Sequence, residues 1–276
     1  MIDPLAVPWR LATALLAGAL CSLQAAPPEK PGPPVQVPED LQLFLLIGQS
    51  NMSGRGVVEP DDREIISQVL TLDKNLAWVP AIDPIHLERI SGVSMGRTFG
   101  RTLVSVNPTC VVGLIPSAVG SSSLEMWKRG GGLYENAVRR TKAALKGGRL
   151  RGILWHQGEG DGILEADALT YGVRWSEFIS ALRADLGAPD APVIVGELCR
   201  SIYQRPDEKT KFALQINQQL ALMSLSVPHV GFVSSEGLID KGDYTHFDSA
   251  SQRELGRRYA LAFLALDPTW APIPRR

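Results

Sequence analysis

Cysteine is scarce in this sequence, with three residues among 276. The chain is therefore not one of the small scaffolds that disulfides hold together. Cys110 begins one apolar run and Cys199 ends another. In a parallel sheet these positions lie at opposite ends, too far apart for a disulfide. Cysteine and histidine are also not grouped at the spacing of metal ligands, so we expect no metal and no cofactor.

A surplus of positive charge is missing as well. Lys and Arg number 28 against 29 Asp and Glu, a formal net charge of -1. A protein that binds nucleic acid or an anionic membrane surface usually carries a basic face, so we expect neither partner. The apolar run from Leu11 to Leu20 is too short to span a bilayer, so no membrane span is predicted.

The first 26 residues resemble a secretory signal peptide. Arg10 precedes the apolar run, and Ala25 and Ala26 offer a small-residue cleavage site. Cys21 would suit a lipoprotein, but Leu20 stands where that signal needs a small residue. We therefore predict a cleaved signal peptide over 1–26 and a secreted or periplasmic protein.

A proline-rich segment follows the signal. Six of the twelve residues from Pro27 to Pro38 are proline, which predicts an extended linker over 27–39. No second break of this kind and no internal repeat follows, so residues 40–276 are predicted to form one domain.

Apolar runs alternate with amphipathic segments through this domain, which predicts parallel βαβ units with helices on both faces of the sheet. Ser249 and Gln252 are predicted to cap the last helix. The expected strands cover 41–47, 76–80, 110–115, 152–155, 192–198 and 230–234, and the expected helices 96–106, 134–145, 171–186, 212–223 and 255–266.

The first strand runs into Gly48-Gln49-Ser50-Asn51-Met52. A buried strand that ends in a tight glycine turn with a serine is a way for an open α/β sheet to present a nucleophile. We therefore predict that Ser50 is the nucleophile. The G-x-S-x-G pattern of α/β-hydrolases is absent, which argues against that fold.

A serine nucleophile needs a base, and the chain has four histidines. His229 precedes a strand, His86 stands in an unpatterned loop, and His156 lies in what looks like a hydrogen-bonding cluster. His246 follows the last strand, at the carboxyl edge, and Asp243 stands three residues before it. We predict His246 as the base and Asp243 as the acid that orients it.

An oxyanion hole needs donors from other loops. Gly120 follows the strand that begins at Cys110, and Gln157 follows the strand that ends at Trp155. We predict that the backbone N–H groups of Ser50 and Gly120 and the side-chain amide of Gln157 form this hole.

Taken together, these residues resemble the SGNH-hydrolase superfamily and, within it, the sialate O-acetylesterase-like domain of carbohydrate esterase family 6. The resemblance covers about 41–266 and rests on the Gly48–Met52 block, Gly120 with Trp127, the Trp155–Glu159 block, and Asp243 with His246. It implies a flavodoxin-like three-layer α/β/α sandwich with a central parallel sheet. It also implies metal-independent removal of acetyl groups from sugar hydroxyls, as in acetylxylan or acetylated sialic acid.

The resemblance also assigns roles, with Ser50, His246 and Asp243 as a catalytic triad. The chain departs from the family pattern at Ser121–Ser123, where a second glycine and a threonine are usual, which puts the substrate fit there in question. Gln49, Asn51, Arg55, His156 and Glu159 are candidates for supporting the site.

Three of these assignments stay open. Glu159 either holds its own loop together or competes with Asp243 as the acid, and Arg55 is expected to pair with a carboxylate such as Glu159. Trp127 either stacks on a sugar or belongs to the core. Two other functions also remain, a non-catalytic carbohydrate-binding protein on the same fold and a general short-chain esterase or lipase.

Overall fold

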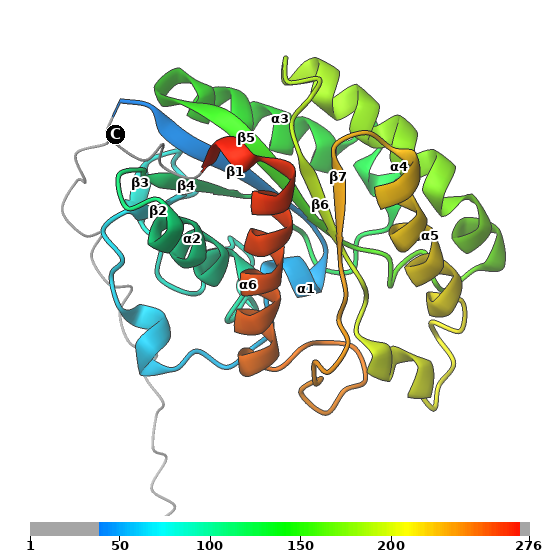
Figure 1. Cartoon of the computed structure of the whole chain (residues 1–276). Helices are drawn as coiled ribbons and strands as arrows, with labels where there is room; N and C mark the ends of the chain where they lie inside the picture. The colour runs from blue at the N-terminus through cyan, green and yellow to red at the C-terminus, as the bar shows by residue number, and fades with distance from the viewer. Residues whose placement is uncertain (1–38, 271–276) are drawn as a thin grey trace, which may run out of the picture. The chain divides into compact units, whose positions relative to one another are not determined.

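Within residues 39–270, which the computed structural model describes, seven strands form one sheet (Figure 1). The predicted signal peptide and all of the linker except residue 39 lie outside the described residues. The sheet order is β3-β2-β4-β1-β5-β6-β7. The strands are β1 (Leu41–Gly48), β2 (Val69–Leu72), β3 (Trp78–Pro80), β4 (Val112–Pro116), β5 (Gly148–His156), β6 (Val193–Gly196) and β7 (Val230–Val233).

The order of the strands confirms the predicted fold class. All neighbouring strands are parallel except β2 and β3. Counted in chain order without these two, the sheet reads 2-1-3-4-5, which is the flavodoxin-like arrangement. β2 was not predicted, because four residues inside a loop-rich stretch carry too little periodicity. The short strand expected over 76–80 is β3, which pairs antiparallel with β2 at the edge.

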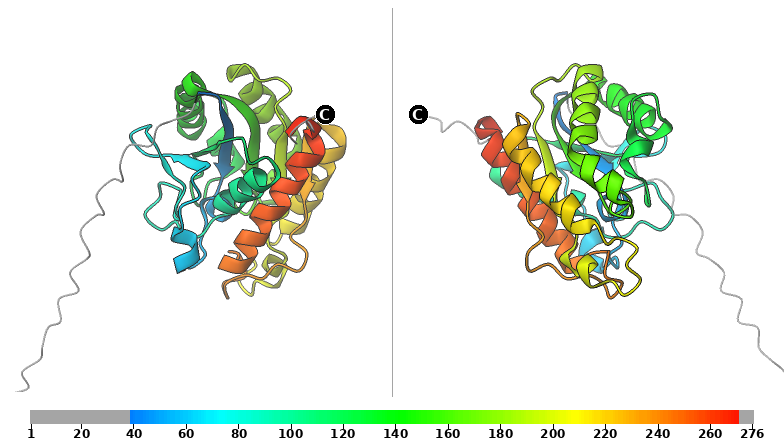
Figure 2. Two further views of the ribbon diagram at one scale, coloured as in Figure 1. Left: turned by 60° about the vertical axis from the view of Figure 1, so that its left-hand side comes forward. Right: turned by 90° about the vertical axis from the view of Figure 1, so that its right-hand side faces the viewer.

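Helices cover both faces of the sheet, so the fold has three layers (Figures 1 and 2). Along β1, Leu43 and Leu45 pack in the core with α3, α4 and α5, whereas Phe44 and Leu46 pack in the other core with α2 and α6. This alternation explains why β1 is a continuous apolar run. The helices are α1 (Ser50–Ser53), α2 (Met95–Val106), α3 (Gly132–Ala144), α4 (Glu165–Asp185), α5 (Ala213–Ser226) and α6 (Ser249–Leu266), with short 3-10 helices at Pro60–Arg63, Leu124–Trp127, Leu145–Gly147, Arg200–Gln204 and Pro268–Trp270. None of the helices in the described range is both long and apolar enough to cross a membrane.

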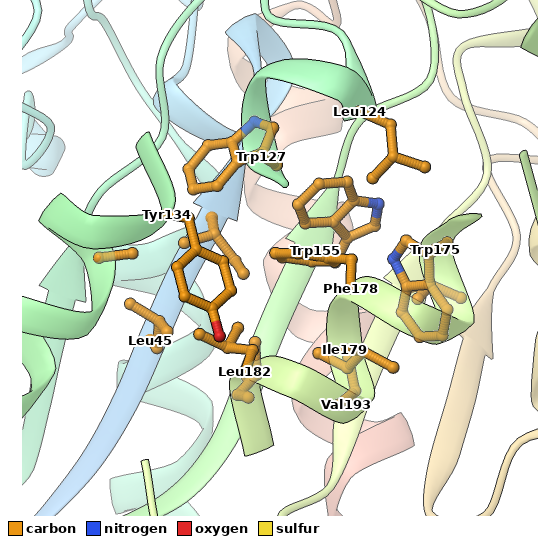
Figure 3. Close-up of a cluster of buried hydrophobic side chains, with 14 of the residues drawn as sticks. Leu45, Leu124, Trp127, Tyr134, Trp155, Trp175, Phe178, Ile179, Leu182 and Val193 are labelled. Carbon is orange, nitrogen blue, oxygen red and sulfur yellow. The ribbon is translucent and has the colours of Figure 1, made fainter. Parts of the chain in front are cut away.

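Trp127 belongs to the core, which decides one of the open assignments (Figure 3). Its ring is fully buried and lies edge-on to Trp155, with 5.7 Å between the ring centroids. Its indole N–H donates to Ser122 Oγ at 2.9 Å. A ring enclosed in this way has no free face on which a sugar could stack.

The predicted cap of the last helix is wrong by one position. Asp248 is the N-cap, and its carboxylate accepts the N–H of Ser251 at 2.7 Å. A carboxylate at the preceding residue satisfies this N–H, so Ser249 becomes the first helical residue. Gln252 points elsewhere, because its amide donates to the carbonyl of Asn51 at 3.0 Å. It therefore ties α6 to the turn that carries Ser50.

Candidate active site

The predicted site residues gather at the carboxyl edge of the sheet. The chain leaves β1 toward β4 on one side and later adds β5 on the other, and ligands bind where the strand order reverses in this way. Ser50 follows β1, Gly120 follows β4, Gln157 follows β5, and His246 lies between β7 and α6.

Gly48 allows the sharp turn that presents Ser50. Its φ is +132°, a region that other residues rarely adopt, and a Cβ there would lie 2.1 Å from the carbonyl oxygen of His156. The next N–H, that of Gln49, donates to the same oxygen at 2.9 Å. β1 and β5 therefore approach so closely that only glycine fits at position 48. Two residues later, Ser50 begins α1.

Ser50, His246 and Asp243 form one chain of hydrogen bonds. Ser50 Oγ lies 2.9 Å from His246 Nε2, and His246 Nδ1 lies 2.7 Å from Asp243 Oδ2. Asp243 Oδ1 accepts the backbone N–H groups of Thr245 at 3.0 Å and His246 at 2.8 Å. The loop thus fixes its own carboxylate, and that carboxylate fixes the imidazole.

Burial and two nearby cations favour the neutral form of the imidazole. Burial lowers the pKa of His246 below its ordinary value, and the positive charges of Arg55 and Lys241 act in the same direction, against the opposite effect of Asp243. Burial alone would raise the pKa of Asp243, but the N–H and imidazole of His246 hold it below its ordinary value. At neutral pH the arrangement is a neutral base beside an ionised carboxylate.

Asn51 joins the serine turn to the histidine loop. Its Nδ2 donates to the carbonyl of Thr245 at 2.9 Å and its Oδ1 accepts the N–H of Phe247 at 3.1 Å, so it binds the backbone on both sides of His246. The same Nδ2 donates to Glu159 Oε1 at 2.6 Å. Asn51 is fully buried. It therefore holds His246 in place relative to Ser50.

Glu159 supports this link rather than facing the imidazole, whose Nδ1 is bonded to Asp243. Burial raises the pKa of Glu159 to about 7, although its hydrogen bonds, including the one from Asn51, oppose this shift. His156 is also structural. Its Nδ1 bonds to the hydroxyl of Tyr259 at 3.0 Å, and burial lowers its pKa to about 3, so the ring is neutral.

The side-chain amide of Gln157, which the sequence predicted as an oxyanion donor, is engaged within the protein. Its Nε2 lies 2.9 Å from the carbonyl oxygen of Ser122, 2.7 Å from Asp161 Oδ2 and 3.2 Å from Gln49 Oε1. An amide nitrogen carries two hydrogens, so these three acceptors leave none for a substrate. Gln49 Oε1 also accepts the N–H of Gly160 at 3.2 Å. The two glutamine side chains thus join the serine turn to the loop after β5.

Glu88 is the site residue that the sequence did not reveal. Its Oε1 accepts the N–H of Gly120 at 2.7 Å, and its Oε2 accepts Ser53 Oγ at 2.7 Å and Arg55 Nη2 at 3.1 Å. We expected Arg55 to pair with a carboxylate such as Glu159, and the carboxylate that it pairs with is that of Glu88. No motif surrounds Glu88, and only the tertiary structure brings its loop to Gly120.

The described residues 39–270 contain no group of three His, Cys, Asp or Glu side chains that could hold a metal ion. Cys110 precedes β4 and Cys199 follows β6, at opposite ends of the sheet, and both are free thiols.

Known proteins are similar to this chain in sequence and in fold. Residues 40–265 match the family described as carbohydrate esterase, sialic acid-specific acetylesterase. A probable carbohydrate esterase of Arabidopsis thaliana is 32% identical over 245 residues, and the match covers 81% of this chain and 90% of that protein. An X-ray structure of a protein from the same plant is 30% identical with a TM-score of 0.74, covering 83% of this chain and 99% of that one. A carbohydrate acetylesterase from Xanthomonas citri, 18% identical with a TM-score of 0.63 over 83% of this chain and 57% of that one, shares the fold. The chain therefore belongs to the family of carbohydrate esterases described as sialic acid-specific acetylesterases.

Proposed function

We propose that this protein is a serine esterase that removes O-acetyl groups from carbohydrates through an acetyl-enzyme intermediate. The observation that carries the proposal is the hydrogen-bonded chain from Ser50 Oγ through His246 to Asp243, with links of 2.9 and 2.7 Å. Membership of the carbohydrate esterase family supports an acetylated carbohydrate as the substrate.

In the first half of the proposed reaction, Ser50 Oγ attacks the acetyl carbonyl carbon while His246 Nε2 accepts the hydroxyl proton. Asp243 accepts the hydrogen bond from Nδ1–H and stabilises the imidazolium. The tetrahedral intermediate then breaks its bond to the sugar oxygen, which leaves with the proton from His246. In the second half, water loses a proton to His246 and attacks the carbonyl carbon of the acetyl-enzyme. The bond to Ser50 Oγ then breaks, Oγ takes the proton back from His246, and the acetyl group leaves as acetate.

The oxyanion of the intermediate needs hydrogen-bond donors. The N–H of Ser50 is one candidate, because the first residue of a helix has no carbonyl of its own helix to bond. The N–H of Gly120 is the other candidate, and its use requires that Glu88 first leave it.

Acetate release tests this proposal. Wild-type protein and Ser50→Ala should be compared on acetylated xylan, acetylated sialic acid and a chromogenic acetate ester. We expect the wild type to release acetate and Ser50→Ala to be slower by about 10⁴-fold or more. Mass spectrometry of quenched reactions should find the acetyl group on the peptide that contains Ser50.

Three results would contradict the proposal. Wild-type protein that binds acetylated glycans but hydrolyses none of the three substrates would be a binding protein. Ser50→Ala with full activity would place the nucleophile elsewhere. A strong preference for long-chain over acetyl esters would instead identify a lipase.

We also propose that residues 1–26 are removed on export, on the evidence of Arg10, the apolar run Leu11–Leu20 and the small residues Ala25 and Ala26. Mass spectrometry of periplasmic or secreted protein should find an N-terminus near residue 27. Exported protein that keeps residues 1–26 would contradict this.

A further inference from the structure

Gly120, Ser53 and Arg55 present three hydrogen-bond donors to one carboxylate. Glu88 Oε1 receives the N–H of Gly120 at 2.7 Å, and Oε2 receives Ser53 Oγ at 2.7 Å and Arg55 Nη2 at 3.1 Å. We call these three donors the carboxylate cradle. Two of them stand three and five residues after Ser50 on the same turn, so the cradle adjoins the proposed nucleophile.

The cradle is held in place by contacts that do not involve Glu88. Arg55 Nη1 donates to Ser53 Oγ at 2.5 Å and to the carbonyl of Gly54 at 2.8 Å. A Cβ on Gly120 would lie 2.5 Å from Arg55 Nη2, so the guanidinium lies close against this backbone. The donors therefore remain directed at a common point when the carboxylate between them is replaced.

Glu88 can leave the cradle more easily than the donors can. Its side chain is 22% exposed, against 9% for Arg55. Leu87 and Ile90 are 49% and 63% exposed, so Glu88 lies on a short surface stretch between the buried residues Ile85 and Val93. Burial alone would raise the pKa of Glu88, but the three donors hold it below its ordinary value, so at neutral pH it is an anion.

We propose that the cradle is a carboxylate-binding site, that Glu88 fills it in the resting protein, and that a productive substrate must displace Glu88 from Gly120. The second half of this inference rests on the proposed function, in which the N–H of Gly120 receives the oxyanion. Glu88 thus competes with the acetyl carbonyl for one donor, and it keeps free carboxylates such as the product acetate out of the site.

Binding of acetate tests the cradle without any need for turnover. Acetate is titrated by NMR into Ser50→Ala and into Ser50→Ala with Glu88→Ala, at constant ionic strength with chloride. We expect saturable binding only in the variant that lacks Glu88. Ser50→Ala with Glu236→Ala is the matched control, because Glu236 is an exposed glutamate whose carboxylate pairs only with Arg200 among the described cations. A folded Glu88→Ala variant that binds no acetate would overturn the proposal.

Kinetics test the displacement. A hydrogen bond to a charged group contributes enough that losing the competitor should raise kcat/KM about 10- to 100-fold in Glu88→Ala. Acetate should then inhibit Glu88→Ala competitively and leave the wild type unaffected. Glu88→Gln, which has the same shape without the charge, should lie between the two.

The acetate titration and the kinetics together distinguish failure of the cradle, of the displacement and of the proposed function. If Glu88→Ala has a lower kcat/KM than the wild type and acetate restores it, then Glu88 supports the loop, and the proposal that substrate displaces Glu88 is wrong. If wild-type protein has no esterase activity but acetate binds the variant without Glu88, the cradle stands and the proposed function fails.

Discussion

Replacing Asp243 with asparagine should slow turnover steeply and leave the fold intact. Asp243 Oδ1 accepts two backbone N–H groups, and Oδ2 accepts His246 Nδ1–H at 2.7 Å. Asparagine has only one acceptor oxygen. If that oxygen stays on the backbone, the NH₂ group faces Nδ1 and favours the tautomer that carries its proton on Nε2. This tautomer cannot accept the proton of Ser50 Oγ.

The expected loss is about 10³- to 10⁴-fold in kcat, which corresponds to about 4–5.5 kcal/mol in the activation free energy. The cost in folding stability should be about 1 kcal/mol, because the pair is only partly buried and one hydrogen bond changes. The assay is kcat on a chromogenic acetate ester at saturation, with urea denaturation of the same samples.

Glu159→Gln is the comparison that could refute this reasoning. Glu159 contacts Asn51 rather than His246, and glutamine keeps an acceptor for Asn51 Nδ2. We expect a loss of kcat below about tenfold. If Asp243→Asn is mild and Glu159→Gln is severe, the acid is Glu159 and the assignment from geometry is wrong.

Two further predictions concern pH and packing. Because burial lowers the pKa of His246 and the base acts when neutral, kcat/KM should rise with pH through a midpoint below about 6.5 and then level off. Lys241→Met should move this midpoint upward in the same pH profile, and a wild-type midpoint above 6.5 would contradict the role of burial. Gly48→Ala should lose at least about 2 kcal/mol more stability in urea denaturation than Gly187→Ala, since both have positive φ but only Gly48 meets the backbone of His156. Equal losses would show that the β1–β5 contact relaxes easily.

The sequence alone determined the layers of the fold and the outline of the site. The continuous apolar run Leu41–Ile47 marked a strand buried on both faces, and the structure places its successive side chains in two different cores. The aspartate three residues before His246 needed only a turn to reach it, and it does so at 2.7 Å. Such features depend on residues close together in the chain, so periodicity and spacing record them.

Tertiary structure decided the partners of the polar side chains. Arg55 pairs with Glu88 rather than with Glu159, and Gln157 directs its amide to Ser122, Asp161 and Gln49. Spacing in the sequence cannot rank such choices, because the competing acceptors lie on different loops, and the packing of the sheet determines which come within hydrogen-bond distance. The sequence therefore predicts which residue types lie at the carboxyl edge of the sheet. Which donors remain for an oxyanion, with Glu88 bound to Gly120, depends on the folded arrangement.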